Sequence, residues 1–197
     1  MSKNTFQEGN YFYKFDAEDN GIDPKICDWF LDSAGADFKK ATILSKHGED
    51  RPNIRKCQTF FNNEDWVYKI IWPYLHNANQ EAQWNFEISA CENYQISKYV
   101  PGDLYNTHID GLGTHGDKII SEHENLNDKV RKISMTMLLN DPSEFEGGEL
   151  LLLNVGAVPQ KKGTMTFFPS YLPHEISPVT KGVRYSLVMW FLGYPFQ

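Results

Sequence analysis

The chain has 197 residues, of which 41% are hydrophobic and 14% aromatic, and its formal net charge is −7. This length suits one domain with one substantial core, and the aromatic content is far from that of a disordered segment. The acidic excess disfavours binding to phosphate backbones, and no stretch is apolar enough to span a membrane. We therefore expect one globular domain over residues 1–197, with its core at about 84–194, whose partner is a protein, a peptide or a small molecule rather than a nucleic acid.

Cysteine use and the N-terminus favour a reducing cytoplasm. The three cysteines, Cys27, Cys57 and Cys91, are odd in number and scattered, which does not suit a disulfide framework. Residues 1–10 also lack the apolar segment of a secretory signal.

The N-terminal third predicts two helices. Asp23 followed by Pro24 is a typical helix start, an apolar stripe follows it, and Gly35 is a typical end. A second helix is expected from Asn62 or Asn63 towards residue 79. The other expected elements here are strands at 5–16, 37–44 and 54–61 and a polar, flap-like loop at 45–53.

From residue 84 onwards the pattern changes to short strands separated by turns. Two helices followed by mostly antiparallel strands predict a mainly β, α+β fold, namely a double-sheet jelly roll (double-stranded β-helix) with N-terminal buttressing helices. A long polar loop at 111–130 is expected to form one rim of any site, and its His115 and His123 are expected to be solvated. The expected strands are 84–89, 92–99, 104–109, 132–140, 149–154, 164–168, 174–178 and 183–192.

Three residues form a candidate metal site. In an extended strand His108 and Asp110 project from the same face, about 6.6 Å apart. A turn at 178–182 predicts a hairpin that places His174 opposite residue 184 or 185, about 5 Å away on the adjacent strand. Arg184 is therefore expected one strand away from His174.

The types of these ligands indicate the metal. Two histidines and one carboxylate form a facial triad that leaves positions open, as in non-haem Fe(II) oxygenases. A structural zinc site would need four ligands, usually including cysteines, and no cysteine here has suitable spacing. The alternative, from these residues alone, is that His108 and His174 are hydrogen-bonded core histidines and that Asp110 forms a turn.

Several ordered motifs between residues 54 and 194 carry a family resemblance. They are Tyr99-x-Pro-Gly-x-x-Tyr105-x-x-His108-x-Asp110, Arg131-Lys-Ile-Ser-Met-Thr-Met-Leu-Leu-Asn140, Glu146-Gly-Gly-Glu-Leu150, Lys162-Gly-Thr-x-x-x-Phe-Pro-Ser170, and His174 with Arg184 ten residues later. Together they resemble the Fe(II)- and 2-oxoglutarate-dependent dioxygenases, in particular the prolyl 4-hydroxylase-like branch with the PKHD-type hydroxylases of bacteria and phages. The high lysine and asparagine content favours an AT-rich bacterial or phage genome, so we expect a bacterial or phage-infected cytoplasm.

The resemblance also implies a cofactor set and roles for residues. The cofactors would be Fe(II), 2-oxoglutarate and O₂, with ascorbate as an optional reductant, and no catalytic residue beyond the metal ligands is implied. Leu138 departs from the family where some relatives have a cosubstrate-binding tyrosine, which shifts weight onto Tyr99 and Arg184. The implied iron ligands are His108, Asp110 and His174, and the implied cosubstrate residues are Arg184, Tyr99, Ser134 and Thr136.

The resemblance favours hydroxylation of a peptidyl proline. Candidate substrate contacts are Arg55, Trp190 and Tyr105, and the alternatives that stay open are a surface ion pair for Arg55 and core packing for the two aromatic residues. Two alternatives remain at this point. One is the same chemistry on a free amino acid or other small molecule, and the other is a non-enzymatic jelly-roll binding module.

Overall fold

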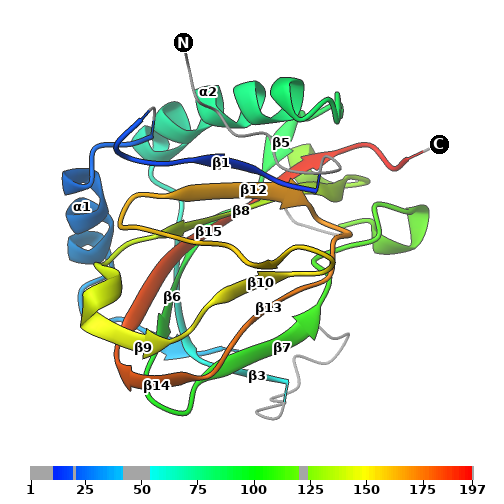
Figure 1. The fold of residues 1–197 in the computed structure, drawn as a ribbon. Helices are drawn as coiled ribbons and strands as arrows, with labels where there is room; N and C mark the ends of the chain where they lie inside the picture. The colour runs from blue at the N-terminus through cyan, green and yellow to red at the C-terminus, as the bar shows by residue number, and fades with distance from the viewer. Residues whose placement is uncertain (1–10, 20, 42–53, 120–123, 197) are drawn as a thin grey trace.

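The computed structural model describes residues 11–19, 21–41, 54–119 and 124–196. Two α-helices precede most of the strands (Figure 1). The helices are α1 (Lys25–Ala34) and α2 (Asp65–Glu81), and short 3₁₀ turns are η2 (His115–Asp117), η3 (Glu124–Leu126) and η4 (Pro142–Glu144). The strands are β1 (Tyr13–Phe15), β2 (Lys39–Lys40), β3 (Arg55–Lys56), β4 (Gln58–Asn62), β5 (Ala90–Cys91), β6 (Tyr94–Tyr99), β7 (Leu104–His108), β8 (Val130–Leu138), β9 (Phe145–Gly147), β10 (Leu150–Leu152), β11 (Gly156–Ala157), β12 (Met165–Pro169), β13 (His174–Ile176), β14 (Val179–Gly182) and β15 (Arg184–Gly193).

Both expected helices are present. At the start of α1, the Asp23 carboxylate accepts a hydrogen bond from the backbone N–H of Lys25 at 2.9 Å, and Pro24 precedes the first helical residue. Gly35 follows the helix at φ +51°, a backbone conformation that favours glycine, and its N–H donates to the Leu31 carbonyl. α2 begins after Glu64, whose carboxylate accepts a hydrogen bond from the Trp66 indole.

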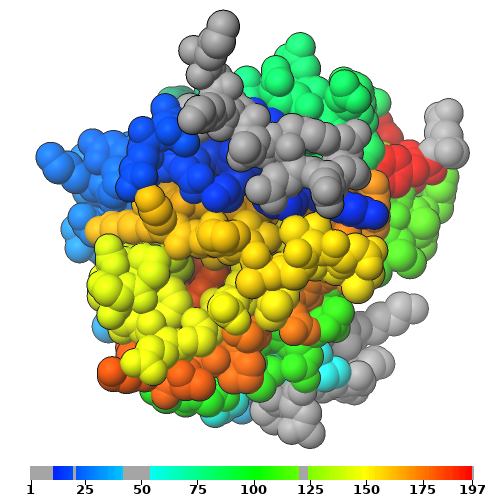
Figure 2. Space-filling model, viewed as in Figure 1, coloured from blue at the N-terminus to red at the C-terminus, as the bar shows by residue number. Residues whose placement is uncertain are grey.

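The strands form antiparallel sheets in two layers. The major sheet has the order β1-β12-β8-β15-β6-β4-β2, with β5 paired to β15, and the minor sheet has the order β11-β10-β13-β7-β3. A two-stranded sheet of β14 and β9 adjoins them. In Figure 1 the minor sheet lies over one face of the major sheet, while α1 and α2 lie away from the minor sheet. Figure 2 shows this side of the molecule hollowed between β9 and the segment after β11, and the floor of the hollow has the colour of β15.

The core sits on the helix-covered face of the major sheet. Phe30 of α1 and Ile71 and Leu75 of α2 are fully buried against this face. The central strands of the major sheet contribute side chains from every second position to the same cluster: Tyr94, Ile96, Ile133, Met135, Met137, Met165, Phe167, Leu187, Met189 and Phe191. The helices therefore act as the predicted buttresses.

The structure corrects several predicted elements. Residues 84–89 are not a strand, and the predicted strand at 5–16 is only β1 within the described residues. The hairpin of 174–178 with 183–192 is wrong, because β13 pairs with β10 and β7 in the minor sheet whereas β15 pairs with β6 and β8 in the major sheet. β14 pairs with β9 between them, so the chain changes sheets instead of turning back.

Two predicted features lie outside the described residues. They are the 45–53 flap and His123. His115 is exposed and is not part of the metal-ligand cluster. None of the helices in the described ranges is long and apolar enough to cross a membrane. The expectation of a single domain over residues 1–197 stays a prediction.

Candidate metal and cosubstrate site

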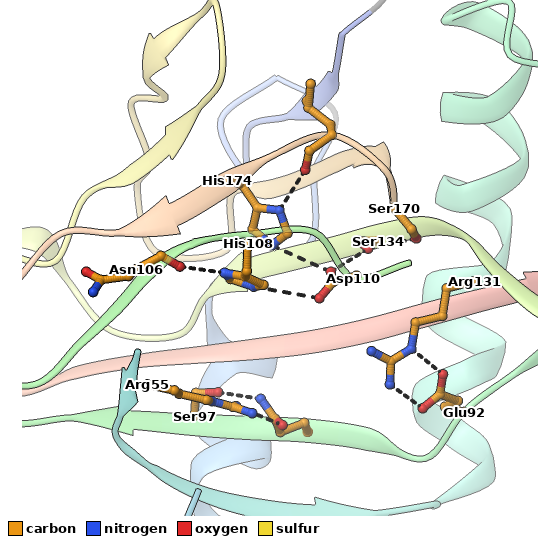
Figure 3. Close-up of polar contacts among 12 residues, drawn as sticks. Arg55, Glu92, Ser97, Asn106, His108, Asp110, Arg131, Ser134, Ser170 and His174 are labelled. Atoms are coloured by element: carbon orange, nitrogen blue, oxygen red, sulfur yellow. Dashed lines mark hydrogen bonds and ion pairs between the residues drawn. The ribbon is translucent and has the colours of Figure 1, made fainter. Parts of the chain in front are cut away.

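The three predicted metal ligands meet between the two sheets. His108 ends β7, Asp110 follows two residues later, and His174 begins β13, where it pairs directly with His108. One ligand atom from each residue lies within 4.8 Å of the other two. Asp110 presents Oδ1 to His108 Nε2 at 3.7 Å and Oδ2 to His174 Nε2 at 3.5 Å. Figure 3 shows the carboxylate facing both rings.

Backbone hydrogen bonds orient both imidazoles. The Nδ1 atom of His108 lies 2.8 Å from the Asn106 carbonyl, and that of His174 lies 2.9 Å from the Leu172 carbonyl. Because a carbonyl only accepts, each Nδ1 carries the proton, and each Nε2 lone pair is left free for a metal. Burial, with help from the neighbouring His174, lowers the pKa of His108 to about 4, so the ring stays neutral at physiological pH.

Ser134 holds the Asp110 carboxylate, and Ser170 supports both residues. Ser134 Oγ donates to Asp110 Oδ2 at 2.7 Å and lies 2.9 Å from Ser170 Oγ (Figure 3). The backbone N–H of Asp110 also donates to the Ser170 carbonyl. Burial alone would raise the pKa of Asp110, but His174 and Arg131, together with the Ser134 hydrogen bond, hold it below its usual value. The carboxylate is therefore ionised and fixed in direction.

Arg184 lies deep between the sheets and is only 1% exposed. Its Nη1 donates to Ser186 Oγ at 3.0 Å, its Nη2 donates to Gln160 Oε1 at 3.2 Å, and its Cζ lies 5.6 Å from the Tyr99 ring centroid. In the part of the chain that the structure describes, no carboxylate pairs with this guanidinium. Burial lowers its pKa. A buried, uncompensated cation of this kind fits an anionic ligand.

A narrow cavity of about 40 Å³ lies beside the triad, between the sheets. Tyr99, Thr136, Ser186 and Trp190 line it together with the three metal ligands. Tyr99 is hydrogen-bonded to the Cys57 thiol, and burial raises the pKa of its phenol. The cavity has a polar end near Tyr99 and Ser186 and apolar walls that include Leu150, Ile176 and Val188.

A larger groove of about 1240 Å³ opens in front of the triad. It runs from His108 and Asp110 to Lys39 of β2 and to Phe61 of β4, whose side chain is 54% exposed. An open groove of this volume suits an extended substrate rather than a fully enclosed one.

Two arginine–aromatic pairs flank this groove. Arg55 Cζ lies 4.8 Å from the Tyr105 ring centroid, and its Nη2 donates to Gln95 Oε1 at 3.1 Å. The Tyr105 ring in turn stacks on His108, with 3.5 Å between the ring centroids. In Figure 3 Arg55 and Arg131 lie to the two sides of the triad.

The second pair is Arg131 with Trp190. Arg131 Cζ lies 4.0 Å from the Trp190 ring centroid, and Nε and Nη2 donate to the two Glu92 carboxylate oxygens at 2.6 and 2.7 Å. Arg131 is thus held rigidly beside Asp110, whose pKa it lowers.

Comparison with known proteins places this geometry in a family. The sequence profile of the 2OG-Fe(II) oxygenase superfamily matches residues 94–192, half of the chain. The chain belongs to this superfamily. The match spans β6 to β15 and therefore contains the triad and Arg184.

Curated relatives within the family match a shorter segment. A PKHD-type hydroxylase of Pseudomonas putida KT2440 is 34% identical over 93 residues, which cover 44% of this chain and 41% of the relative. A PKHD-type hydroxylase of Saccharophagus degradans is 37% identical over 93 residues with the same coverage. The chain thus spans less than half the length of these relatives.

Solved structures of the family share the fold over nearly the whole chain. The viral collagen prolyl hydroxylase of Paramecium bursaria Chlorella virus-1 superposes with a TM-score of 0.67 at 20% identity, covering 94% of this chain and 98% of that one. A prolyl-4-hydroxylase of Pseudomonas putida gives a TM-score of 0.64 at 19% identity, with 91% of each chain covered. At these identities the likeness concerns the fold, and it confirms the predicted jelly roll with N-terminal helices.

The residues present fit the family's Fe(II) and 2-oxoglutarate. Two neutral imidazoles and an ionised carboxylate form the two-histidine, one-carboxylate donor set that suits Fe(II). Arg184, buried and without a carboxylate partner, suits the far end of a dicarboxylic acid, and the narrow cavity lies between the sheets that carry these two features. Fe(II), 2-oxoglutarate and O₂ are therefore the cofactors that this family and this site imply.

The structure brings most of the other sequence-predicted residues to the site. Thr136, Trp190, Tyr105 and Arg55 line the cavities, whereas the Ser134 hydroxyl contacts Asp110 rather than the cavity. Sequence reasoning did not assign several residues that the structure places here: Cys57, Glu92, Gln95, Arg131, Gln160 and Ser170. For Arg131 the scarcity of arginine in this chain was a signal, since only four of 19 basic residues are arginine. For the other five the sequence carries no local signal.

Proposed function

We propose that this protein is an Fe(II)- and 2-oxoglutarate-dependent dioxygenase that hydroxylates a proline within a peptide or protein. The observation that carries the peptide substrate is the groove of about 1240 Å³ in front of the triad, which is far larger than a free amino acid requires. The superfamily membership supports the chemistry, and the P. putida prolyl-4-hydroxylase and the viral collagen prolyl hydroxylase support the choice of proline.

Each group of residues has a separate task in this proposal. His108, Asp110 and His174 hold the metal, and Ser134 keeps the Asp110 carboxylate in position. Together, the bound iron and 2-oxoglutarate supply the oxidation, in which O₂ is consumed, 2-oxoglutarate is converted to succinate and CO₂, and a substrate C–H becomes C–OH.

The protein contributes binding and orientation. Arg184 binds the distal carboxylate of 2-oxoglutarate, and Tyr99 and Thr136 border the same cosubstrate in the narrow cavity. Trp190 lies where this cavity meets the groove, since it lines both. Arg55 and Arg131 then present guanidinium groups on the two sides of the substrate, where each can donate to backbone carbonyls.

The intact triad argues against a vestigial binding module. Both imidazoles are anchored through Nδ1, and the carboxylate is anchored through Ser134. Metal ligands need such hydrogen bonds to fix their orientation, whereas side chains that only fill the core do not. We therefore place the enzyme ahead of the binding module.

Succinate formation tests the chemistry. Purified protein with Fe(II), 2-oxoglutarate and a mixture of proline-containing peptides should form succinate, and His174→Ala should abolish it, because two ligands do not hold the metal in a facial geometry. The matched control is His115→Ala, which removes an exposed histidine outside the cluster and should leave succinate formation unchanged. An unmodified protein that forms no succinate with any substrate would rule out the enzyme.

Mass spectrometry of the same mixture tests the substrate. A peptide should gain the mass of one oxygen atom, on proline, and the gain should disappear in His174→Ala. Hydroxylation of free proline without any modified peptide would contradict the peptide substrate and leave the small-molecule alternative.

A further inference from the structure

One nitrogen of the Arg184 guanidinium, Nε, has no protein partner in the described ranges. Nη1 and Nη2 donate to Ser186 and Gln160, but Nε, which is buried, has no partner among the described residues. A buried donor without a partner costs about 1–3 kcal/mol, and more when the group is charged. This N–H is therefore available to a ligand.

The amide of Gln160 also has a buried nitrogen without a hydrogen-bond partner among the described residues. A guanidinium can only donate, so the Gln160 atom that faces Arg184 must be the carbonyl Oε1, and the orientation of the amide is fixed. The Nε2 amine is then the branch of the amide that does not contact Arg184 Nη2. It is buried and has no partner in the described ranges. Arg184 and Gln160 are thus a hydrogen-bonded pair with free N–H donors on both members.

Neighbouring groups keep this pair in place. Gly148 (φ +65°) packs directly against Arg184, because a Cβ atom there would lie 2.8 Å from Arg184 Cδ and 2.9 Å from a Val179 methyl group. Leu138, which pairs with Ser186 across β8 and β15, adds no donor near Arg184. The donors at this end of the site are therefore held in position before a ligand arrives.

We propose that Gln160 is a second residue that binds the distal carboxylate of the 2-oxo acid, donating from Nε2 while its Oε1 positions Arg184. In this arrangement the amide and the guanidinium together select a dicarboxylic 2-oxo acid over a monocarboxylic one. The inference rests on the part of the proposed function that assigns 2-oxoglutarate as the cosubstrate, and it does not depend on the peptide substrate.

Ligand binding without turnover tests this role. Calorimetric titration of the Mn(II)-loaded protein, without a peptide, gives the dissociation constants of 2-oxoglutarate and of pyruvate, which is a 2-oxo acid without the distal carboxylate. Gln160→Ala should weaken the binding of 2-oxoglutarate about tenfold, which is the usual effect of losing one hydrogen bond to a charged group. The dissociation constant of pyruvate should change by less than about twofold.

Gln160→Glu is the sharper variant. It keeps an oxygen that accepts from Arg184, so the native contact and the fold are retained, but it replaces the free amine by an acceptor and neutralises the guanidinium. 2-Oxoglutarate should then bind about 100-fold more weakly than to the unmodified protein, while the dissociation constant of pyruvate should change by less than about twofold. The control is Gln80→Glu, which adds the same charge at an exposed position of α2 and should change neither constant.

The outcomes separate this inference from the proposed function. If 2-oxoglutarate binds the unmodified protein and both Gln160 variants equally, Gln160 does not touch the carboxylate and only the inference is overturned. Equal weakening of pyruvate would also overturn it, since the effect would then be a general distortion. If the unmodified protein does not bind 2-oxoglutarate, the proposed function and the inference are both wrong.

Discussion

The two faces of strand β15 differ in chemistry although they share one backbone. Leu187, Met189 and Phe191 point to the helices and are fully buried among apolar side chains. Arg184 and Ser186 point to the opposite face, towards the minor sheet, and are buried among polar groups. Both faces exclude water. On the helix-covered face this stabilises the fold through the hydrophobic effect, and on the face towards the minor sheet it isolates charged groups from solvent.

This difference indicates that the fold depends on one face and the chemistry on the other. Burial of apolar side chains stabilises the native state, whereas burial of Arg184 without a carboxylate partner costs free energy. The apolar face and the two helices therefore offset the cost of the polar face. Substitutions on the two faces should have opposite signatures in stability and in ligand binding.

The largest stability effect is expected on the apolar face. Phe191 is fully buried and contacts the rings of Phe167 and Trp72, with centroids 6.2 and 5.9 Å away. Phe191→Ala should lower the free energy of unfolding by about 3–5 kcal/mol, because it leaves a cavity in the core. Urea unfolding followed by circular dichroism measures this. The binding of 2-oxoglutarate per folded molecule should stay the same.

The matched control is Phe61→Ala in the same sheet. Its side chain is 54% exposed, so the loss should stay within about 0.5 kcal/mol. Equal losses for Phe61 and Phe191 would contradict the division between the faces.

The reverse signature is expected for Arg184→Met. Methionine has a similar length and no charge, so removing the uncompensated guanidinium should leave the stability unchanged or raised. The affinity for 2-oxoglutarate should fall about 100-fold, since a charged, bidentate donor is lost. Thermal unfolding and calorimetric titration of the same sample measure both effects. A clear drop in stability would show that Arg184 supports the fold as well as the ligand.

Sequence alternation correctly predicts the faces of β15. Trp190 lies three alternations beyond Arg184, so a regular strand places both on one face, and Ser186, Val188 and Trp190 line the narrow cavity. His108 and Asp110 both reach the triad as expected, although Asp110 lies two residues beyond the end of β7. Period-two reasoning succeeds where the strand is regular.

Alternation fails at two irregularities. On β7, Tyr105 and His108 are three residues apart, but their partners on β13, Ile176 and His174, are only two residues apart. This register shift lets the Tyr105 and His108 rings stack, although strict alternation would place them on opposite faces. On β8, Lys132 is the extra residue between the pairs Leu192–Arg131 and Phe191–Ile133, so Arg131 turns to the same face as Ser134. No residue type in either strand marks such an insertion.

The wrong hairpin has a different cause. Turn residues at 178–182 indicate a reversal of the chain but not which partners the flanking strands choose. The partners of β13 and β15 were fixed by β7, β10, β6 and β8, which lie far away in the sequence. Arg184 still reaches the site, because the two sheets face each other across it.

The smallest of these effects is expected for Ser134→Ala, which tests the polar face without touching a metal ligand. The substitution removes the 2.7 Å hydrogen bond to Asp110 Oδ2 and leaves the carboxylate free to rotate. Metal affinity should fall at least about tenfold, as for other residues that orient a ligand. Anaerobic titration with Fe(II) measures it. Ser97→Ala is the matched control, since Ser97 is equally buried on β6 but accepts from Gln95 instead. Equal loss of metal affinity in the two variants would mean that burial of polar groups in general, and not the orientation of Asp110, sets the affinity of the triad.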